Sequence, residues 1–241
     1  MKIVKIEIPF QCKMTRTQII LGWIYVALHI FALPRLLQLF AEFSPNPVNS
    51  AQCTLLWYCL GIVFILCVLL RWLRGNFDML LDNLIVCIIC MVIGVAVQYV
   101  MSIPTSVILI AVESNGVENP GNANMLLQAA GNYGIVKAVG IFIAPIVEEV
   151  LFRGVVFGSI RPRSRFWAYA VSVLLFSAYH VAGYAVGSGD LTQLIYILQY
   201  VPAAIVLAWV YEHSGCIWTS IFYHMGYNAL SFAVMNLLDQ L

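Results

Sequence analysis

This chain contains several long runs without a charged side chain. From Leu84 to Ile103 there is no Asp, Glu, Lys or Arg, and comparable runs recur along the 241 residues. A run of this length can cross the hydrocarbon core of a bilayer as a helix. Because lipid offers the backbone no hydrogen-bond partner, a spanning segment satisfies its peptide groups within its own helix. The sequence therefore predicts an all-α polytopic membrane protein.

Composition agrees with this class. The chain is 62% hydrophobic and 10% charged, whereas soluble domains are nearer half apolar and a quarter charged. The net charge of +1 and the lack of a basic stripe argue against nucleic acid as a partner. The expected partner is the lipid bilayer.

The apolar runs predict about seven transmembrane helices in one bundle, or eight if residues 104–135 add a partial span. Residues 104–124 are expected to form either an exposed loop or a short re-entrant helix at 105–112, and glycine-rich residues 183–190 a loop. The expected spans are Ile19–Leu39, Cys53–Leu70, Leu84–Ile103, a fourth that begins within Met125–Gly140 and ends at Ile160, Phe166–Ala182, Leu191–Tyr211 and Cys216–Leu238.

The chain divides into three regions. Residues 1–18 form a cytoplasmic or interfacial arm, residues 19–134 form helices without a recognised motif, and residues 135–241 form a helical core. Basic residues gather before the first span, after the second, and after the fourth at Arg161–Arg165. This asymmetry places the N-terminus in the cytoplasm.

The fourth span carries Glu148, Glu149 and Arg153 in an otherwise apolar stretch. A charge at membrane depth costs a few kcal/mol or more, so such residues face a protein interior and indicate a site. Glu149 and Arg153 are spaced i, i+4 with the acid first, which favours an intrahelical ion pair. Glu148 has no partner at that spacing, so we expect it to face a cavity. The alternative is an ionic cluster that only holds helices together.

Three further polar residues lie inside later spans. His180 lies late in the fifth, and His224 and Asn228 share one face of the seventh because they are four residues apart. At a rise of about 1.5 Å per residue, Glu148 and His180 lie roughly 20 and 22 Å from the Arg161–Arg165 turn, and His224 and Asn228 roughly 14 and 20 Å from the Gly215 turn. All four are predicted to share one depth. Each histidine alone could be a satisfied buried side chain.

This set of residues suits hydrolysis of an amide bond. A buried glutamate beside a histidine can deprotonate water, and a His/Asn pair can stabilise the developing oxyanion. Glu148, His180 and His224 could instead hold a divalent metal such as zinc, although the chain has no His-Glu-x-x-His motif. Cys87 and Cys90 have a metal-like spacing but lie in an apolar helix, which favours packing.

The motifs Glu-Glu-x-x-x-Arg at 148–153, Phe-x-x-x-His at 176–180 and His-x-x-x-Asn at 224–228 occur in this order on hydrophobic spans. They resemble the CAAX-protease and bacteriocin-processing family (CPBP, or Abi) of intramembrane proteases over about residues 135–238. The resemblance implies Glu148 as the water-activating base, His180 as its assistant, and His224 and Asn228 as oxyanion donors. Glu149 and Arg153 match the remaining motif positions. Members are often called metalloproteases, and the sequence does not decide the metal requirement.

The resemblance also bears on substrate. Eukaryotic members trim prenylated CAAX proteins, and bacterial members are linked to peptide pheromone or bacteriocin maturation and self-immunity. A chain this short, with small loops and no targeting extension, is more similar to the bacterial branch. We expect a membrane-associated peptide or protein to enter the site from the membrane. The alternatives are a non-catalytic bacteriocin-immunity or scaffold protein and a proton-coupled transporter; the oligomeric state stays open.

Overall fold

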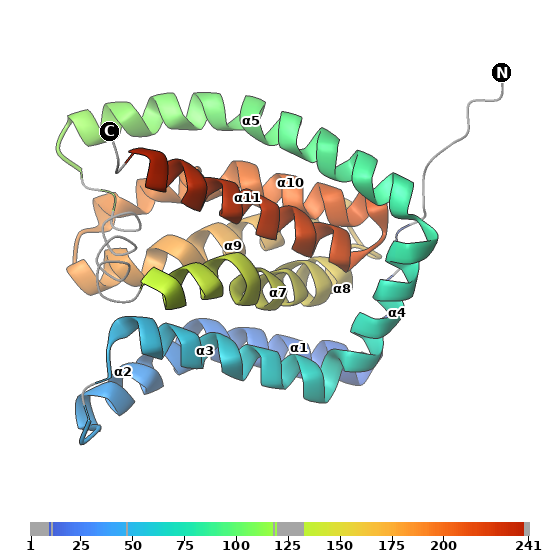
Figure 1. The fold of residues 1–241 in the computed structure, drawn as a ribbon, viewed down its shortest axis with the longest axis horizontal. Coiled ribbons are helices and arrows are strands. Elements are labelled where there is room, and N and C mark those ends of the chain that lie inside the picture. The colour runs from blue at the N-terminus through green and yellow to red at the C-terminus, as the bar shows by residue number, and fades with distance from the viewer. Residues whose placement is uncertain (1–9, 11, 47, 118, 120–132, 239–241) are drawn as a thin grey trace.

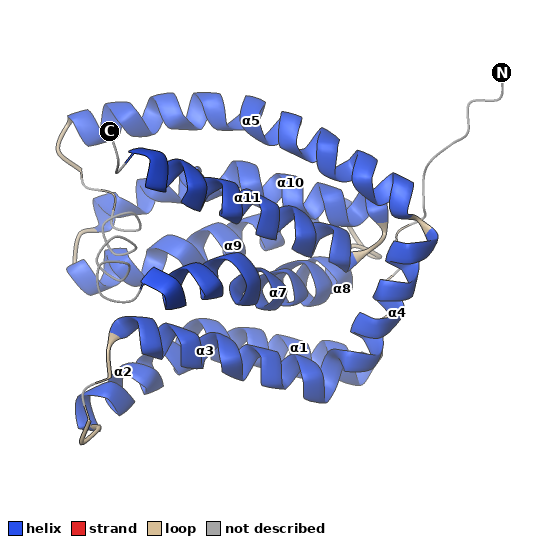
Figure 2. Cartoon of the chain, in the orientation of Figure 1, coloured by secondary structure: helices blue, strands red, loops and turns tan. Residues whose placement is uncertain are grey.

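The computed structural model describes residues 10, 12–46, 48–117, 119 and 133–238, and within them all regular structure is helical (Figure 2). The predicted all-α class is therefore confirmed. Five helices in this part of the chain are long and apolar enough to cross a membrane. A total of seven or eight spans stays a prediction. The five helices are Arg16–Phe43, Ser50–Asp82, Leu84–Ser114, Arg165–Ser188 and Leu191–Ser214.

Local sequence accounts for several helix ends. Thr15 with Gln18, and Asn49 with Gln52, form capping boxes at the first two helices. Gly189 and Gly215 adopt left-handed φ values of 73° and 65° where later helices end. In order, the elements are α1 (Arg16–Ala27), η1 (Leu28–Ala32), α2 (Leu33–Phe43), α3 (Ser50–Phe64), η2 (Ile65–Leu69), α4 (Leu70–Asp82), α5 (Leu84–Ser114), η3 (Val139–Ile143), α7 (Ala144–Glu148), η4 (Glu149–Phe157), α8 (Gly158–Ile160), α9 (Arg165–Ser188), η5 (Leu191–Tyr196), α10 (Ile197–Ser214) and α11 (Ile217–Leu238).

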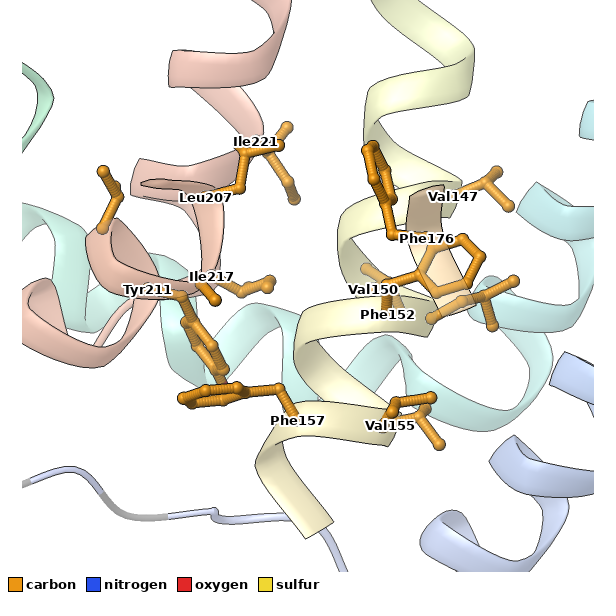
Figure 3. Packing of buried hydrophobic residues seen from close by; sticks show 14 of the residues in the cluster. Val147, Val150, Phe152, Val155, Phe157, Phe176, Leu207, Tyr211, Ile217 and Ile221 are labelled. Carbon is orange, nitrogen blue, oxygen red and sulfur yellow. The ribbon is translucent and has the colours of Figure 1, made fainter. Parts of the chain in front are cut away.

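Residues 133–160 form one unbroken helix at the centre of the bundle. α1 and α3 cover one side of it, and α9, α10 and α11 cover the other (Figure 1). Every residue of η4 is buried. Figure 3 shows Phe152 against Phe176 of α9, an edge-to-face pair with ring centroids 5.4 Å apart. The charged motif therefore faces protein rather than lipid, as expected for intramembrane charges.

Of the two alternatives expected for residues 104–124, the helical one is present at 105–112 as part of α5, and the loop expected at 183–190 is largely helical instead. α5 does not end near Ile103 but passes through Pro104 to Ser114, because Leu109 packs with Val181 and Tyr196. α9 continues through the expected loop at 183–190 as far as Ser188. In α5 this packing overrides the helix-breaking tendency of Pro104. In α9 the stretch that contains Gly183 and Gly187 is mostly exposed, and Ala185 is its buried residue. The start of the fourth span, at 125–132, lies outside the described residues.

Four segments in the described part of the chain, η1 to η4, are π-helical, a form that is rare and concentrated at functional sites. Each leaves a backbone carbonyl to be satisfied by a side chain from another helix. The four side-chain bonds are Trp57 Nε1 to His29 O (3.1 Å), Gln18 Nε2 to Val68 O (3.0 Å), Asn228 Nδ2 to Gly140 O (2.8 Å) and Ser172 Oγ to Phe152 O (2.9 Å). These hydrogen bonds join neighbouring helices at fixed positions along their axes.

Candidate active site

A cavity of about 310 Å³ lies between the central helix and its neighbours. Glu148, His180, His224 and Asn228 all line it, from three different helices. Glu149 and Arg153 are not among its lining residues. The structure thus brings together the four residues expected at one depth. It places Glu149 and Arg153 outside the cavity lining.

Glu148 is the acid that faces the cavity, and it is only 3% exposed. Its Oε2 lies 3.8 Å from Nε2 of His180 and 3.8 Å from Nε2 of His224. These distances exceed a direct hydrogen bond and suit contacts made through a water molecule. Its Oε1 accepts a 2.5 Å hydrogen bond from the Tyr58 hydroxyl on α3. Glu148 was expected to lack a partner at the i, i+4 spacing, and the partner that it has, Tyr58, comes from another helix.

Both histidines are held by their Nδ1 atoms. His180 Nδ1 lies 2.8 Å from the carbonyl oxygen of Phe176, and His224 Nδ1 lies 2.9 Å from Oε1 of Glu149. Since these oxygens accept only, each Nδ1 carries the hydrogen. A neutral imidazole in this tautomer presents a lone pair at Nε2, on the side of Glu148. Either ring can donate from Nε2 only after it gains a second proton.

Glu149 sits at the centre of a buried ionic network. Arg153 donates to its Oε1 over 3.0 Å, and both side chains are fully buried. Ser220 donates to its Oε2 over 2.5 Å. Arg153 also donates to the carbonyl of Ala204 over 3.1 Å, and its guanidinium lies 4.1 Å from the centre of the Phe176 ring. The network links the central helix to α9, α10 and α11 and holds His224 in place.

The hydrogen bonding of the Asn228 side chain follows from the backbone of the central helix, which lies opposite it. The Ala144 N–H bonds the carbonyl of Val139, one residue earlier than in an α-helix. The next residue is Pro145, which has no N–H to offer the next carbonyl, that of Gly140. Asn228 Nδ2 donates to this Gly140 oxygen over 2.8 Å. An amide nitrogen carries two hydrogens, so one remains for a ligand in the cavity.

The residues that are linked to Glu148 through hydrogen bonds were not predicted from the sequence. The Tyr58 hydroxyl lies 3.0 Å from that of Tyr179, which lies 3.3 Å from Nε2 of the fully buried His29. The one hydroxyl hydrogen of Tyr58 is donated to Glu148, so Tyr58 must accept from Tyr179. Tyr179 in turn accepts from His29 Nε2. No motif marks these residues. Ser220 could have been found, because it precedes His224 by four residues on the same helix face.

The donor types of Glu148, His180 and His224 match those of catalytic zinc sites. A hydrogen bond from each Nδ1 to an acceptor is also the usual arrangement behind a metal-bound histidine. However, the described residues include no group of three His, Cys, Asp or Glu side chains placed to hold a metal ion. Cys87 and Cys90 are buried in the packing of α5. We therefore derive no catalytic step through a metal.

Comparison with known proteins supports the family suggested by the motifs. Residues 132–230 match the sequence model of the family described as type II CAAX prenyl endopeptidase Rce1-like. These residues contain all seven residues of the three motifs. This match supports the resemblance of residues 132–230 to the CPBP family. The protein named "Putative membrane peptidase YdiL" of Bacillus subtilis (strain 168) is 25% identical over 119 residues.

That alignment covers 49% of this chain and 43% of the relative, so the similarity spans less than half of the relative's length. No solved structure matches the chain. The CPBP match begins just before the central helix and leaves out α1 to α5. Tyr58 therefore reaches the motif residue Glu148 from outside the matched region, and His29 reaches Tyr179 from there as well.

Proposed function

We propose that this protein is an intramembrane endopeptidase of the CPBP type, acting on a membrane-associated peptide or protein that enters from the membrane. The observation that carries the proposal is the cavity in which Glu148 faces the Nε2 atoms of His180 and His224. Bacterial peptide, pheromone or bacteriocin maturation, or CAAX-like processing, would use such a site. We place it in a bacterial plasma membrane with its N-terminus in the cytoplasm.

In the first step, Glu148 Oε2 takes a proton from a water molecule while the water oxygen attacks the carbonyl carbon of the substrate. The lone pair on His180 Nε2 orients the water by accepting its other hydrogen. Tyr58 holds Glu148 through Oε1, which leaves Oε2 for the reaction. A positioned carboxylate of this kind contributes about 10²–10⁴-fold to a rate.

The attack places negative charge on the carbonyl oxygen. Asn228 donates its free amide hydrogen to this oxyanion, and His224 donates to it from Nε2, which has taken up a proton from solvent water before the substrate binds. Glu149, 2.9 Å from Nδ1, stabilises the imidazolium that results. Glu148 then passes its proton to the leaving nitrogen as the C–N bond breaks, which gives an amine and a carboxylic acid.

The test is peptide cleavage by purified protein in lipid vesicles, with products from a defined peptide mixture identified by mass spectrometry. We expect Glu148→Gln and His180→Ala each to lower cleavage by about 10²-fold or more, with protein yield and unfolding temperature unchanged. The matched control is Glu42→Gln, at an exposed position on α2, which should cleave like the natural protein. Equal cleavage by all four proteins would exclude Glu148 and favour a scaffold or immunity role.

A second measurement distinguishes the glutamate–water mechanism from a metal-dependent mechanism at Glu148, His180 and His224. We expect a chelator to leave the cleavage rate unchanged, because the proposed base is Glu148 itself. Stoichiometric zinc in the purified protein, together with loss of cleavage on chelation and recovery on adding zinc, would contradict this mechanism. Glu148, His180 and His224 would then be the metal ligands.

A further inference from the structure

A second cavity, of about 210 Å³, lies between α5 and α11 beside the first. Gln98, Tyr223 and Tyr227 line both cavities, so the two cavities are adjacent and share these side chains as a common wall. Its remaining wall is apolar and comes from one face of each helix. These other lining residues are Met91, Val95 and Tyr99 of α5 and Phe222, Gly226 and Leu230 of α11.

Gln98 is the polar exception at this junction. Its side chain is 3% exposed in the middle of an apolar helix, and its Oε1 accepts a 2.6 Å hydrogen bond from the Tyr223 hydroxyl. Among the described residues, its Nε2 has no hydrogen-bond partner. A buried donor left without a partner costs about 1–3 kcal/mol, so such groups are rare and call for an explanation. Tyr223 fixes the amide so that the donor end stays free.

The chemistry of this donor decides which occupant suits the second cavity. A lipid chain could fill the apolar wall, but it has no atom that could accept the Gln98 hydrogen. A peptide has both a side chain for the apolar wall and a backbone carbonyl for the amide. The shared lining residues place that carbonyl close to the cavity that contains Glu148.

We infer that the second cavity is a specificity subsite for a bulky apolar side chain of the peptide substrate, and that Gln98 donates from Nε2 to a backbone carbonyl of the same substrate. This inference rests on the proposed peptidase function. It adds that the enzyme selects its cleavage site through an apolar residue near the scissile bond. Tyr223 acts through Gln98 and is a positioning residue.

Gly226 offers a way to close the subsite without disturbing its surroundings. It lies on the cavity wall, and a Cβ added there would meet no atom within 4 Å. A leucine at this position would therefore occupy space that the substrate side chain needs. Gly75 on α4 is a matched control, because it is another helical glycine with open space around it and lines neither cavity.

The experiment compares Gly226→Leu and Gly75→Leu in the vesicle assay, with peptides that carry either alanine or a bulky apolar residue at each position around the cleaved bond. For Gly226→Leu we expect kcat/KM to fall about tenfold or more for the preferred bulky residue relative to alanine, as for other pocket-filling changes. Gly75→Leu should keep the natural preference. An unchanged preference in Gly226→Leu would overturn the inference and indicate a lipid-filled groove.

A second variant tests the hydrogen bond. Gln98→Met with Tyr223→Phe removes both polar partners, a change that is close to neutral for stability when the pair serves no structural purpose. We expect an unchanged or higher unfolding temperature, a raised KM and a nearly unchanged kcat. A lower unfolding temperature with KM unchanged would show that the pair only joins α5 to α11. If the natural protein and Glu148→Gln are equally inert on all peptides, the proposed function fails, and this inference with it.

Discussion

Glu148 and Glu149 are neighbours in the chain, yet the fold gives them different partners. Glu149 is fully buried and engaged by Arg153, Ser220 and His224. Glu148 faces the cavity with one oxygen held by Tyr58 and the other directed at two imidazoles. An acid with one oxygen uncommitted can exchange a proton, whereas an acid paired on both oxygens serves as a fixed charge.

Tyr58→Phe tests whether the hydrogen bond from Tyr58 positions Glu148 for the reaction. A hydrogen bond to a charged group contributes about 1.5–3 kcal/mol, so its loss should lower kcat by about 10- to 100-fold. The measurement is the steady-state cleavage rate together with the unfolding temperature. Tyr25→Phe is the control, because the Tyr25 hydroxyl is buried and has no hydrogen-bond partner in the part of the chain that the structure describes. Equal rates for the two variants would show that Tyr58 does not act on Glu148.

At the scale of the element, the central helix owes its shape to π-helical segments and prolines. Pro145 follows η3 and leaves the carbonyl of Gly140 free. The same arrangement recurs where Pro34 follows η1 and the carbonyl of His29 accepts from Trp57. In a membrane such a carbonyl needs a partner from a neighbouring helix. The proline therefore creates the acceptor that positions Asn228 in the cavity.

A double-mutant cycle separates the structural and catalytic parts of Asn228. Asn228→Ala should lower the free energy of unfolding by about 1–3 kcal/mol, because it leaves a buried carbonyl unpaired. Pro145→Ala restores an N–H within the central helix that can bond that carbonyl, so the double variant should regain stability. Cleavage should stay low in both, because the oxyanion donor is absent. Recovery of cleavage in the double variant would assign Asn228 a structural role alone.

At the scale of the whole molecule, the N-terminal helices complete a site whose motifs lie in the C-terminal half. Close packing of α1 and α3 against the central helix makes this possible. A Cβ on Gly22 of α1 would lie 2.7 Å from Val155, and a Cβ on Gly61 of α3 would lie 2.6 Å from Val147. The two glycines let α1 and α3 pack directly on the central helix. Tyr58, one turn before Gly61, reaches Glu148 as a result.

Gly61→Ala should push α3 away from the central helix and move Tyr58 from Glu148. We expect a lower unfolding temperature and about a tenfold or greater loss of cleavage, similar to that of Tyr58→Phe. Adding Val147→Ala removes the obstructing methyl groups and should restore part of both properties. Gly75→Ala, which meets no neighbour, should change neither. Failure of Val147→Ala to compensate would exclude this contact as the cause.

The sequence alone determined the class of the protein and the candidate set of residues. Apolar runs require helices in lipid, and intramembrane charges and histidines are costly enough to reveal a site, so Glu148, His180, His224 and Asn228 could be chosen by type and depth. Only the tertiary structure decided that Glu148 bonds Tyr58, that the histidines present their Nε2 atoms, and that residues 104–114 and 183–188 are helical. The physical reason is that depth follows from distance along one helix, whereas partners depend on how helices rotate and pack against one another. Tyrosines, glutamines and glycines give no signal of that packing in an apolar sequence.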